Sequence, residues 1–538
     1  MGKRDLVFAC VVVATGSALA TYFRYSHSSS SADQEPASRW SANAFPAAVD
    51  GVNAAIRKGW AETSTTPAPA ASDLAVMRRL SLALTGSIPS LEEIRKFEAS
   101  PRASRIDAHL NVLLKDRRAA DYLAERMARA FVGTEDGPFI VFRRRRFVSW
   151  LSDQFFANRR YDAIVRDLIA GDGFWTDHPA TNFVTVTREE KSERPDPERL
   201  AARVSRAFLG SRIDCAQCHD HPFQSWKQED FRGLAAFFGG VHADLRGVTD
   251  DALDYQPLDR KTKEAKAVAP RVPSLPELCP TEGDARDRLA SWVTNPKNPR
   301  LAIATTNRVW ALLFGRPLVD PVDDLPAESD LPPTLILLAD DFAAHGYDLH
   351  RLICLIASTE AFRLESARDA SNGSPTDQDE EAWAVFPLSR MRPEQVAGSL
   401  YQATSVSTLG PQFHWFFRLI AYTQRNDFVR RYGDTGEDEF GSRSGTIPQR
   451  LLLMNGDLVV ERIKEDLFSA TSQVASLSSD AKSAVEAAYL SVLTRRPTPE
   501  ERDYFVAKIE ATEKDERIAR VTDLYWTLLN ATEFSWNH

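Results

Sequence analysis

The sequence of 538 residues predicts a mainly α protein, with two helical domains behind an N-terminal signal or membrane-anchor segment. Three observations support this prediction. Capping signals recur along the chain at the starts of segments with helical apolar periodicity. Strand signals are sparse, and the best candidate is the short segment 183–187. The first 25 residues combine basic residues with an apolar run, which is typical of an export signal.

Residues 1–25 contain Lys3 and Arg4, then an apolar run from Leu6 to Phe23 with small residues suited to cleavage after Ala20. The apolar run of about 18 residues is marginal for spanning a bilayer, so a cleaved signal and a membrane anchor both remain open. In either case we expect an exported protein, periplasmic or anchored to the membrane and facing the periplasm. Residues 26–44 have the serine-rich composition of a polar linker.

Composition limits the classes of function. An apolar content of 43% is sufficient for hydrophobic cores, and a net charge of −9 argues against a nucleic-acid partner. Five cysteines are few for an exported protein of this size. Cys10 lies in the apolar run, while Cys279 and Cys354 are isolated in sequence. The latter two are expected either to pair with each other or to remain buried thiols.

Several helices can be placed from local signals. Residues 47–60 carry a helical apolar pattern. Ser90 and Glu93 form a capping box, as do Thr498 and Glu501, where Pro499 occupies the first helical position. These signals predict helices that begin directly after Ser90 and Thr498.

One string implies a specific chemistry: Cys215-Ala-Gln-Cys218-His219 is the sequence signature of covalent haem c attachment. The two thiols can add across the haem vinyl groups, and the adjacent imidazole can bind the iron. A helix is predicted upstream, beginning at Asp196-Pro197 and ending at Gly210, and a second helix follows a capping box of Ser225 and Gln228. The motif is therefore expected in a loop between two packed helices.

The haem hypothesis leaves the opposite face of the iron open. A six-coordinate haem would need a distal ligand, because His221 remains on the same side of the macrocycle as His219. A five-coordinate haem would instead suit ligand binding or peroxidase-like chemistry. The residues that could serve as distal ligand are Met127, Met391, Met454, His242 and His414, and the sequence does not rank them.

A metal site without haem is the main alternative. Cys215, Cys218, His219 and His221 supply two thiolates and two imidazoles, which are ligands that zinc binds tetrahedrally. Because four ligands within seven residues strain a single ion, one ligand could instead be His242 or Asp220. A closed site of this kind would be a structural knuckle in a binding or scaffolding protein, whereas an open site could activate water in an extracytoplasmic metal-dependent hydrolase. A disulfide between the two cysteines is the third possibility.

Acidic residues at Asp320, Asp323 and Asp324 bear on the hydrolase hypothesis, because they would have to converge with the cysteine loop to take part in hydrolysis. Their other interpretation is structural, as turn caps paired with arginines such as Arg308 and Arg316. The basic run 143–146 is interpreted as a solvated face or a partner contact rather than a nucleic-acid site.

Two sets of segments carry a resemblance to known families. In the N-terminal half these are residues 79–89, 158–162, 205–210, 215–223, Trp226 and 234–238. In the C-terminal half they are residues 307–310, 314–316, 323–324, 386–395 and 446–455. The first set resembles the planctomycete cytochrome-type family of unknown function, and the second resembles the planctomycete-specific domain of unknown function that usually follows it.

With this resemblance, we expect a helical cytochrome-type domain at 45–245, a linker at 246–284 and a helical planctomycete-specific domain at 285–535. The family name implies a link to cytochromes. The sequence therefore favours an exported, cytochrome-associated protein that binds haem c through Cys215, Cys218 and His219 for electron transfer or redox chemistry. Its expected partner is an extracytoplasmic redox or scaffold protein, with membrane attachment through the N-terminal segment still open. Whether it is an enzyme is undecided.

Overall fold

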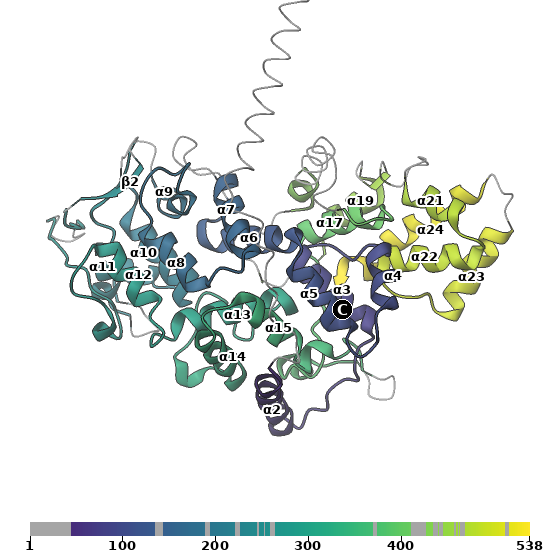
Figure 1. The fold of residues 1–538 in the computed structure, drawn as a ribbon, viewed down its shortest axis with the longest axis horizontal. Helices are drawn as coiled ribbons and strands as arrows, with labels where there is room; N and C mark the ends of the chain where they lie inside the picture. Colours follow the sequence, from purple (N-terminus) through teal and green to yellow (C-terminus); the bar gives the residue numbers. More distant parts are fainter. Residues whose placement is uncertain are drawn as a thin grey trace, which may run out of the picture. The chain divides into compact units, whose positions relative to one another are not determined.

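The structure is a computed structural model of the chain (Figure 1). The predicted signal or anchor segment and the polar linker lie outside the residues that it describes. The described residues are 45–134, 144–188, 194–220, 226–244, 247–251, 253–258, 264–368, 374–409, 427–433, 440, 445–456, 459–460, 462, 469–511 and 516–538.

The fold is mainly α, as the sequence predicts, and its strands are short. The helices before residue 250 are α2 Pro46–Glu62, α3 Asp73–Thr85, α4 Leu91–Ala99, α5 Arg105–Leu114, α6 Arg117–Val132, α7 Arg144–Phe156, α8 Tyr161–Ala170, α9 Asn182–Thr185, α10 Pro197–Val204 and α11 Gln228–Ala236. Those after it are α12 Ala285–Val293, α13 Arg300–Phe314, α14 Pro333–Ala344, α15 Leu349–Ala357, α16 Asp377–Glu381, α17 Pro393–Ala403, α19 Ile447–Asn455, α21 Ala470–Leu477, α22 Ala481–Leu493, α23 Pro499–Glu510 and α24 Arg517–Leu529. The strands form two antiparallel pairs, β1 Val241–Asp244 with β2 Gly247–Asp250 and β3 Ser389–Arg390 with β4 Trp536–Asn537.

The capping boxes predicted at Ser90 and Thr498 are confirmed. At the start of α4, Ser90 Oγ accepts the Glu93 N–H at 3.0 Å, and a Glu93 carboxylate oxygen accepts the Ser90 N–H at 2.8 Å. The same reciprocal pair joins Thr498 and Glu501 at the start of α23. Each box satisfies two donors that a helix start would otherwise leave without partners.

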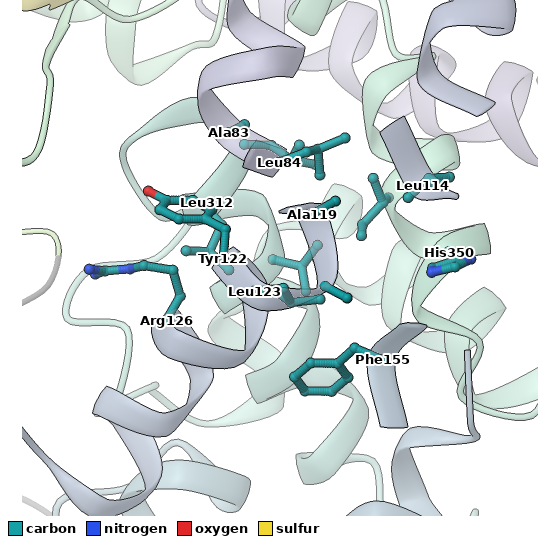
Figure 2. A pocket seen from close by; sticks show the side chains of 14 residues that line it. Ala83, Leu84, Leu114, Ala119, Tyr122, Leu123, Arg126, Phe155, Leu312 and His350 are labelled. Carbon is teal, nitrogen blue, oxygen red and sulfur yellow. The ribbon is translucent and has the colours of Figure 1, made fainter. Parts of the chain in front are cut away.

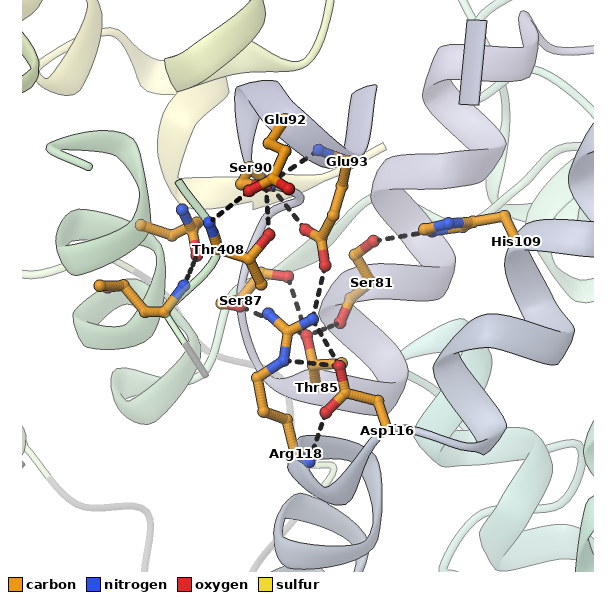
Figure 3. A network of polar contacts seen from close by, with 12 residues as sticks. Ser81, Thr85, Ser87, Ser90, Glu92, Glu93, His109, Asp116, Arg118 and Thr408 are labelled. Atoms are coloured by element: carbon orange, nitrogen blue, oxygen red, sulfur yellow. Dashed lines mark hydrogen bonds and ion pairs between the residues drawn. The ribbon is translucent and has the colours of Figure 1, made fainter. Parts of the chain in front are cut away.

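The box at Ser90 belongs to a wider polar network that joins α4 to α6 (Figure 3). The Arg118 guanidinium forms ion pairs with Asp116, at 2.7 Å, and with Glu93. The Ser90 hydroxyl lies 2.8 Å from that of Thr408, so the start of α4 is also tied to a segment more than 300 residues further along the chain. Local capping thus becomes part of the tertiary structure.

Two local predictions are wrong. Residues 183–187 do not form a strand, because Asn182–Thr185 is a short helix in which Phe183 and Val184 are fully buried. The Asn182 side chain fixes this turn by donating to the carbonyls of Trp175 and Pro179, and such tertiary contacts override β propensity.

The second error concerns the start of α11. Its N-cap is Lys227, not Ser225, because an Asp230 carboxylate oxygen accepts the Lys227 N–H at 2.9 Å. The helix therefore begins two residues later than the predicted capping box implies. Ser225 itself lies outside the described residues.

Helix α13 is the central element of the larger hydrophobic cluster. Every residue from Leu301 to Phe314 is buried, as expected for a helix surrounded by other elements. It packs against α3, α14, α15 and the helical turn that continues α10 (Figure 1). The cluster draws on residues from Phe45 to Phe386, so side chains from both sides of segment 246–284 share one core.

We predict that His109 makes the fold sensitive to acid. This imidazole is 8% exposed, and burial lowers its pKa to about 4. Because the unfolded chain takes up this proton near pH 6.5, the free energy of unfolding should fall between pH 6.5 and pH 4, by roughly 2–3 kcal/mol. Thermal unfolding of the wild type and of His109→Gln at pH 7.5 and pH 4.5 should show a smaller acid-induced loss in the variant. Equal losses in the two proteins would contradict the prediction.

Candidate functional site

The Cys215–His219 turn lies between two packed helices, α10 and α11 (Figure 1). Helix α10 begins with the predicted cap, in which an Asp196 carboxylate oxygen accepts the N–H groups of Glu198 and Arg199. It continues as a wider turn over Ser205–Leu209. The chain then passes through Gly210 into a 3₁₀ turn at Asp214–Gln217, before α11 begins.

Gly210 is required at the end of the first helix for two reasons. Its φ of 58° lies in the left-handed region, which side chains other than glycine rarely adopt. A Cβ at this position would also lie 2.8 Å from Leu325 Cδ1 and 3.2 Å from Ala304 Cβ. The prediction that Gly210 ends the helix is confirmed, and the close approach of α13 is an additional reason for a glycine there.

Cys215 lies within the 3₁₀ turn, and Cys218 directly follows its last residue, Gln217. Both are exposed free thiols, whereas Ala216 between them is fully buried. The turn therefore packs its backbone against the core and presents its two sulfur atoms to solvent.

The His219 ring is oriented by its own backbone neighbour. Its Nδ1 lies 2.7 Å from the Asp220 carbonyl oxygen, and because a carbonyl can only accept, Nδ1 must carry the proton. This tautomer leaves the lone pair on Nε2 of an exposed ring. Nε2 is thus the atom available to bind a metal ion or a haem iron.

The far end of the turn is tied to both helices. Gln228, the first residue of α11, donates its side-chain amide to the Gln217 carbonyl at 3.1 Å and its backbone N–H to Asp220 Oδ1 at 2.9 Å. The Gln217 side chain donates to the Glu198 carboxylate on α10, which also accepts the Tyr255 hydroxyl at 2.6 Å. Burial, together with this bond to a carboxylate, raises the pKa of Tyr255.

Two family models match the chain. Residues 51–243 match PSCyt2, a protein of unknown function (DUF1549), and residues 285–432 match PSD1, a protein of unknown function (DUF1553). The two matches follow one another along the chain in this order. The resemblance seen in the sequence is thereby confirmed. No match was found among curated proteins or among solved structures.

The DUF1553 domain reaches the base of the turn through two of the predicted acids. Asp323 pairs with the Arg212 guanidinium at 2.7 Å, and Asp324 Oδ1 accepts the Arg212 backbone N–H at 3.2 Å. The expectation that these acids pair with Arg316 is wrong, since Arg316 forms its ion pair with Glu380. Local sequence patterns did not indicate Arg212, because its acidic partners lie 111 and 112 residues further along the chain.

Arg300, at the start of α13, is the second residue that sequence reasoning missed. Its guanidinium donates to the carbonyls of Leu209 and Gly210 in the DUF1549 domain, at 3.1 and 3.3 Å. It also donates to the Pro326 carbonyl at 3.0 Å in the DUF1553 domain. One side chain thus bridges the loop that leads to the cysteines and the loop that carries the acids.

Of the remaining candidate ligands, the structure describes Met127, Met391, Met454 and His242. Met127 and Met391 are buried in hydrophobic clusters, and His242 Nε2 lies 2.8 Å from Asp251 Oδ2. Met454 is 37% exposed on α19. His221 and His414 fall outside the described residues. Among the residues that the structure describes, three or more His, Cys, Asp or Glu side chains do not converge as a metal site would require.

The structure also describes Cys279, Cys354 and part of the basic run 143–146. Cys354 is a buried free thiol, and Cys279 is a partly exposed one. Arg144 forms a two-pronged ion pair with Glu125, at 2.8 and 2.9 Å, within the run that the sequence interpretation assigned to a solvated face or a partner contact. Arg143 is not among the described residues.

A small cavity lies elsewhere in the core, between α3, α6, α13 and α15 (Figure 2). Its volume is about 30 Å³, and its lining is mostly apolar, with Tyr122, Arg126 and His350 as polar members. This space suits about one or two water molecules and is far too small for a planar macrocycle. Residues of the cysteine turn do not line it.

A search for membrane-spanning segments within the described ranges found no helix with the necessary length and apolarity.

We predict that Arg300 stabilises the junction of the two domains. Arg300→Leu removes the hydrogen bonds that this side chain donates to several carbonyl groups and should lower the free energy of unfolding by about 3 kcal/mol. Arg160→Leu serves as a control, because Arg160 is 63% exposed and pairs only at the surface, so its loss should change stability by no more than about 0.5 kcal/mol. Urea unfolding followed by circular dichroism measures both changes. Similar losses in the two variants would contradict this role of Arg300.

Proposed function

We propose that the protein holds haem c covalently at Cys215 and Cys218, with His219 as an axial ligand, and serves in electron transfer or other redox chemistry. The observation that carries the proposal is the pair of exposed free thiols at the 3₁₀ turn, with Cys215 inside the turn and Cys218 directly after it. His219 follows directly, with Nε2 available as a ligand atom. When bound, haem would supply a one-electron redox centre.

The contacts around the turn suit a large cofactor held at the surface. Thioether formation requires thiols that a macrocycle can approach, and both sulfur-bearing side chains are exposed. The Asp220 carbonyl fixes the imidazole tautomer, a device that commonly orients metal-binding histidines. Because the turn is hydrogen-bonded to α11 through the Gln217 carbonyl and to α10 through the Gln217 side chain, its residues can hold the position of a ligand without reorganisation.

Exposure of the turn also suits exchange of electrons with another protein. A cofactor attached at Cys215 and Cys218 would have an edge open to solvent, where a redox partner can dock. We propose that this partner is extracytoplasmic, and that the chain is exported through its N-terminal segment, either cleaved or retained as a membrane anchor. Covalent haem attachment by this motif in exported proteins is consistent with that location.

The same donor set keeps one alternative open. Two thiolates and His219 could bind zinc with His221, in a structural knuckle of a scaffolding protein. A hydrolase has less support, because Asp323 and Asp324 reach the base of the turn but are engaged by Arg212. The experiment below separates haem from zinc directly.

We predict that the protein, expressed with a c-type maturation system, yields a pyridine haemochrome spectrum of c-type haem that survives acid extraction. The double variant Cys215→Ala/Cys218→Ala should lose this haem, because no thioether can form. Cys279→Ala removes a free thiol outside the turn and should keep it. If the wild type carries zinc and no haem, the metal-knuckle alternative is correct and the haem proposal fails.

The role of His219 gives a separate prediction. His219→Ala should keep the covalently bound haem, since both thiols remain, but should lose the absorption features of an imidazole-ligated iron. Added imidazole should restore these features by occupying the vacated position. Visible and magnetic circular dichroism spectra with and without imidazole provide the measurement. An unchanged spectrum in His219→Ala would mean that another residue ligates the iron.

A further inference from the structure

We infer that Asp323 of the DUF1553 domain is a positioning residue for the Cys215–His219 turn of the DUF1549 domain, acting through Arg212. The inference rests on the proposed function for what the turn holds. It rests on the contacts of the described residues for how the turn is held. If the inference holds, the DUF1553 domain contributes to the Cys215–His219 site, which lies in the DUF1549 domain.

The contact lies directly before the turn. Arg212 is three residues ahead of Cys215, and its Nε donates to Asp323 Oδ1 at 2.9 Å while Nη2 lies 2.7 Å from the same oxygen. The backbone N–H of Arg212 donates to Asp324 Oδ1 at 3.2 Å. Two neighbouring carboxylates therefore hold one residue by its side chain and by its main chain.

The acidic loop is itself fixed to the buried helix α13. The Asn307 side chain donates to the Val319 carbonyl at 2.8 Å and accepts the Val319 N–H at 3.1 Å. At the other end of the loop, the Leu325 N–H donates to the Gly210 carbonyl at 2.8 Å. The carboxylate of Asp323 thus has a position set by the core of its own domain.

The segment between Arg212 and the first thiol is short and constrained. Ile213 is 1% exposed, and its carbonyl accepts the Ala216 N–H at 2.9 Å. Asp214 pairs with Arg206 on the preceding helical turn at 2.8 Å. With both sides of this segment anchored, a displacement of Arg212 must shift or loosen the 3₁₀ turn that orients Cys215.

Because the Arg212–Asp323 ion pair lies near the surface, its effect on the turn can be distinguished from its effect on the stability of the whole protein. The Arg212 side chain is 46% exposed, and that of Asp323 is 18% exposed. Exposed pairs of this kind add little to the free energy of folding, because solvent screens them. A planar guanidinium nevertheless fixes the direction of a carboxylate contact. Loss of the pair should therefore alter the turn more than it alters global unfolding.

The test uses the full chain in two forms, one expressed without haem maturation and one with it. Asp323→Ala should make amide hydrogen exchange in residues 211–218 about fivefold faster in the haem-free form, and Asp323→Asn should give a smaller change. The matched control is Asp107→Ala, because the Asp107 carboxylate is 19% exposed and also pairs with a distant arginine, Arg363. The control should leave exchange in 211–218 unchanged.

In the haem-loaded form, Asp323→Ala should lower the fraction of chains with covalently attached haem and should move acid-induced loss of the His219 ligand to higher pH. Circular dichroism establishes that each variant is folded, and Asp323→Asn, which preserves side-chain size, replaces Asp323→Ala if that variant does not fold. Exchange, haem content and acid titration that match the Asp107→Ala control would overturn the inference. A wild type without haem would overturn the proposed function alone, because the exchange rates would still decide the role of Asp323.

Discussion

Loops that leave buried helix ends carry carbonyl groups that must find donors, and in this protein arginine side chains supply many of them. Arg300 joins the loop before the cysteine turn to the acidic loop of the second domain. Arg79 donates to the carbonyls of Phe362 and Leu364, and Arg286 to carbonyls at the end of α8. Each of these cations crosses between segments far apart in sequence, so the helices are placed relative to one another by their loops as well as by their apolar faces.

Burying an arginine side chain such as Arg300 costs free energy, because its charge leaves water. Burial lowers the pKa of Arg300, which means that the surroundings disfavour its charge. The cost of burying the cation is offset by the hydrogen bonds that its guanidinium donates to several carbonyl groups. The two loops are therefore coupled: neither can move without depriving the other of part of its hydrogen bonding. This coupling extends from α13, in which every residue from Leu301 to Phe314 is buried, to the base of the cysteine turn.

The sequence was informative where a few adjacent residues determine structure. The caps at Ser90, Thr498 and Asp196 and the helix end at Gly210 follow from hydrogen bonds or backbone angles within one turn of helix, and they were predicted correctly. The β propensity of residues 183–187 predicts a strand, but residues 183–185 become buried in a short helix. Propensity alone does not account for such tertiary burial. The same limit applies to the site: the motif was visible in the sequence, whereas Arg212 and Arg300 were not, because their partners come from distant segments.

The backbone and the side chains of the cysteine turn have different surroundings. Its backbone is held at the near end by Arg212 and Gly210 and at the far end by Gln228, while its reactive groups remain exposed. A catalytic site that excludes water would bury those groups instead. A rigid surface turn with exposed thiols is suited to present a bound group to another molecule, since the position of the group is set by the fold and its outer edge stays accessible. The second domain then contributes to this property through the contacts that fix the turn, without having to touch the bound group itself.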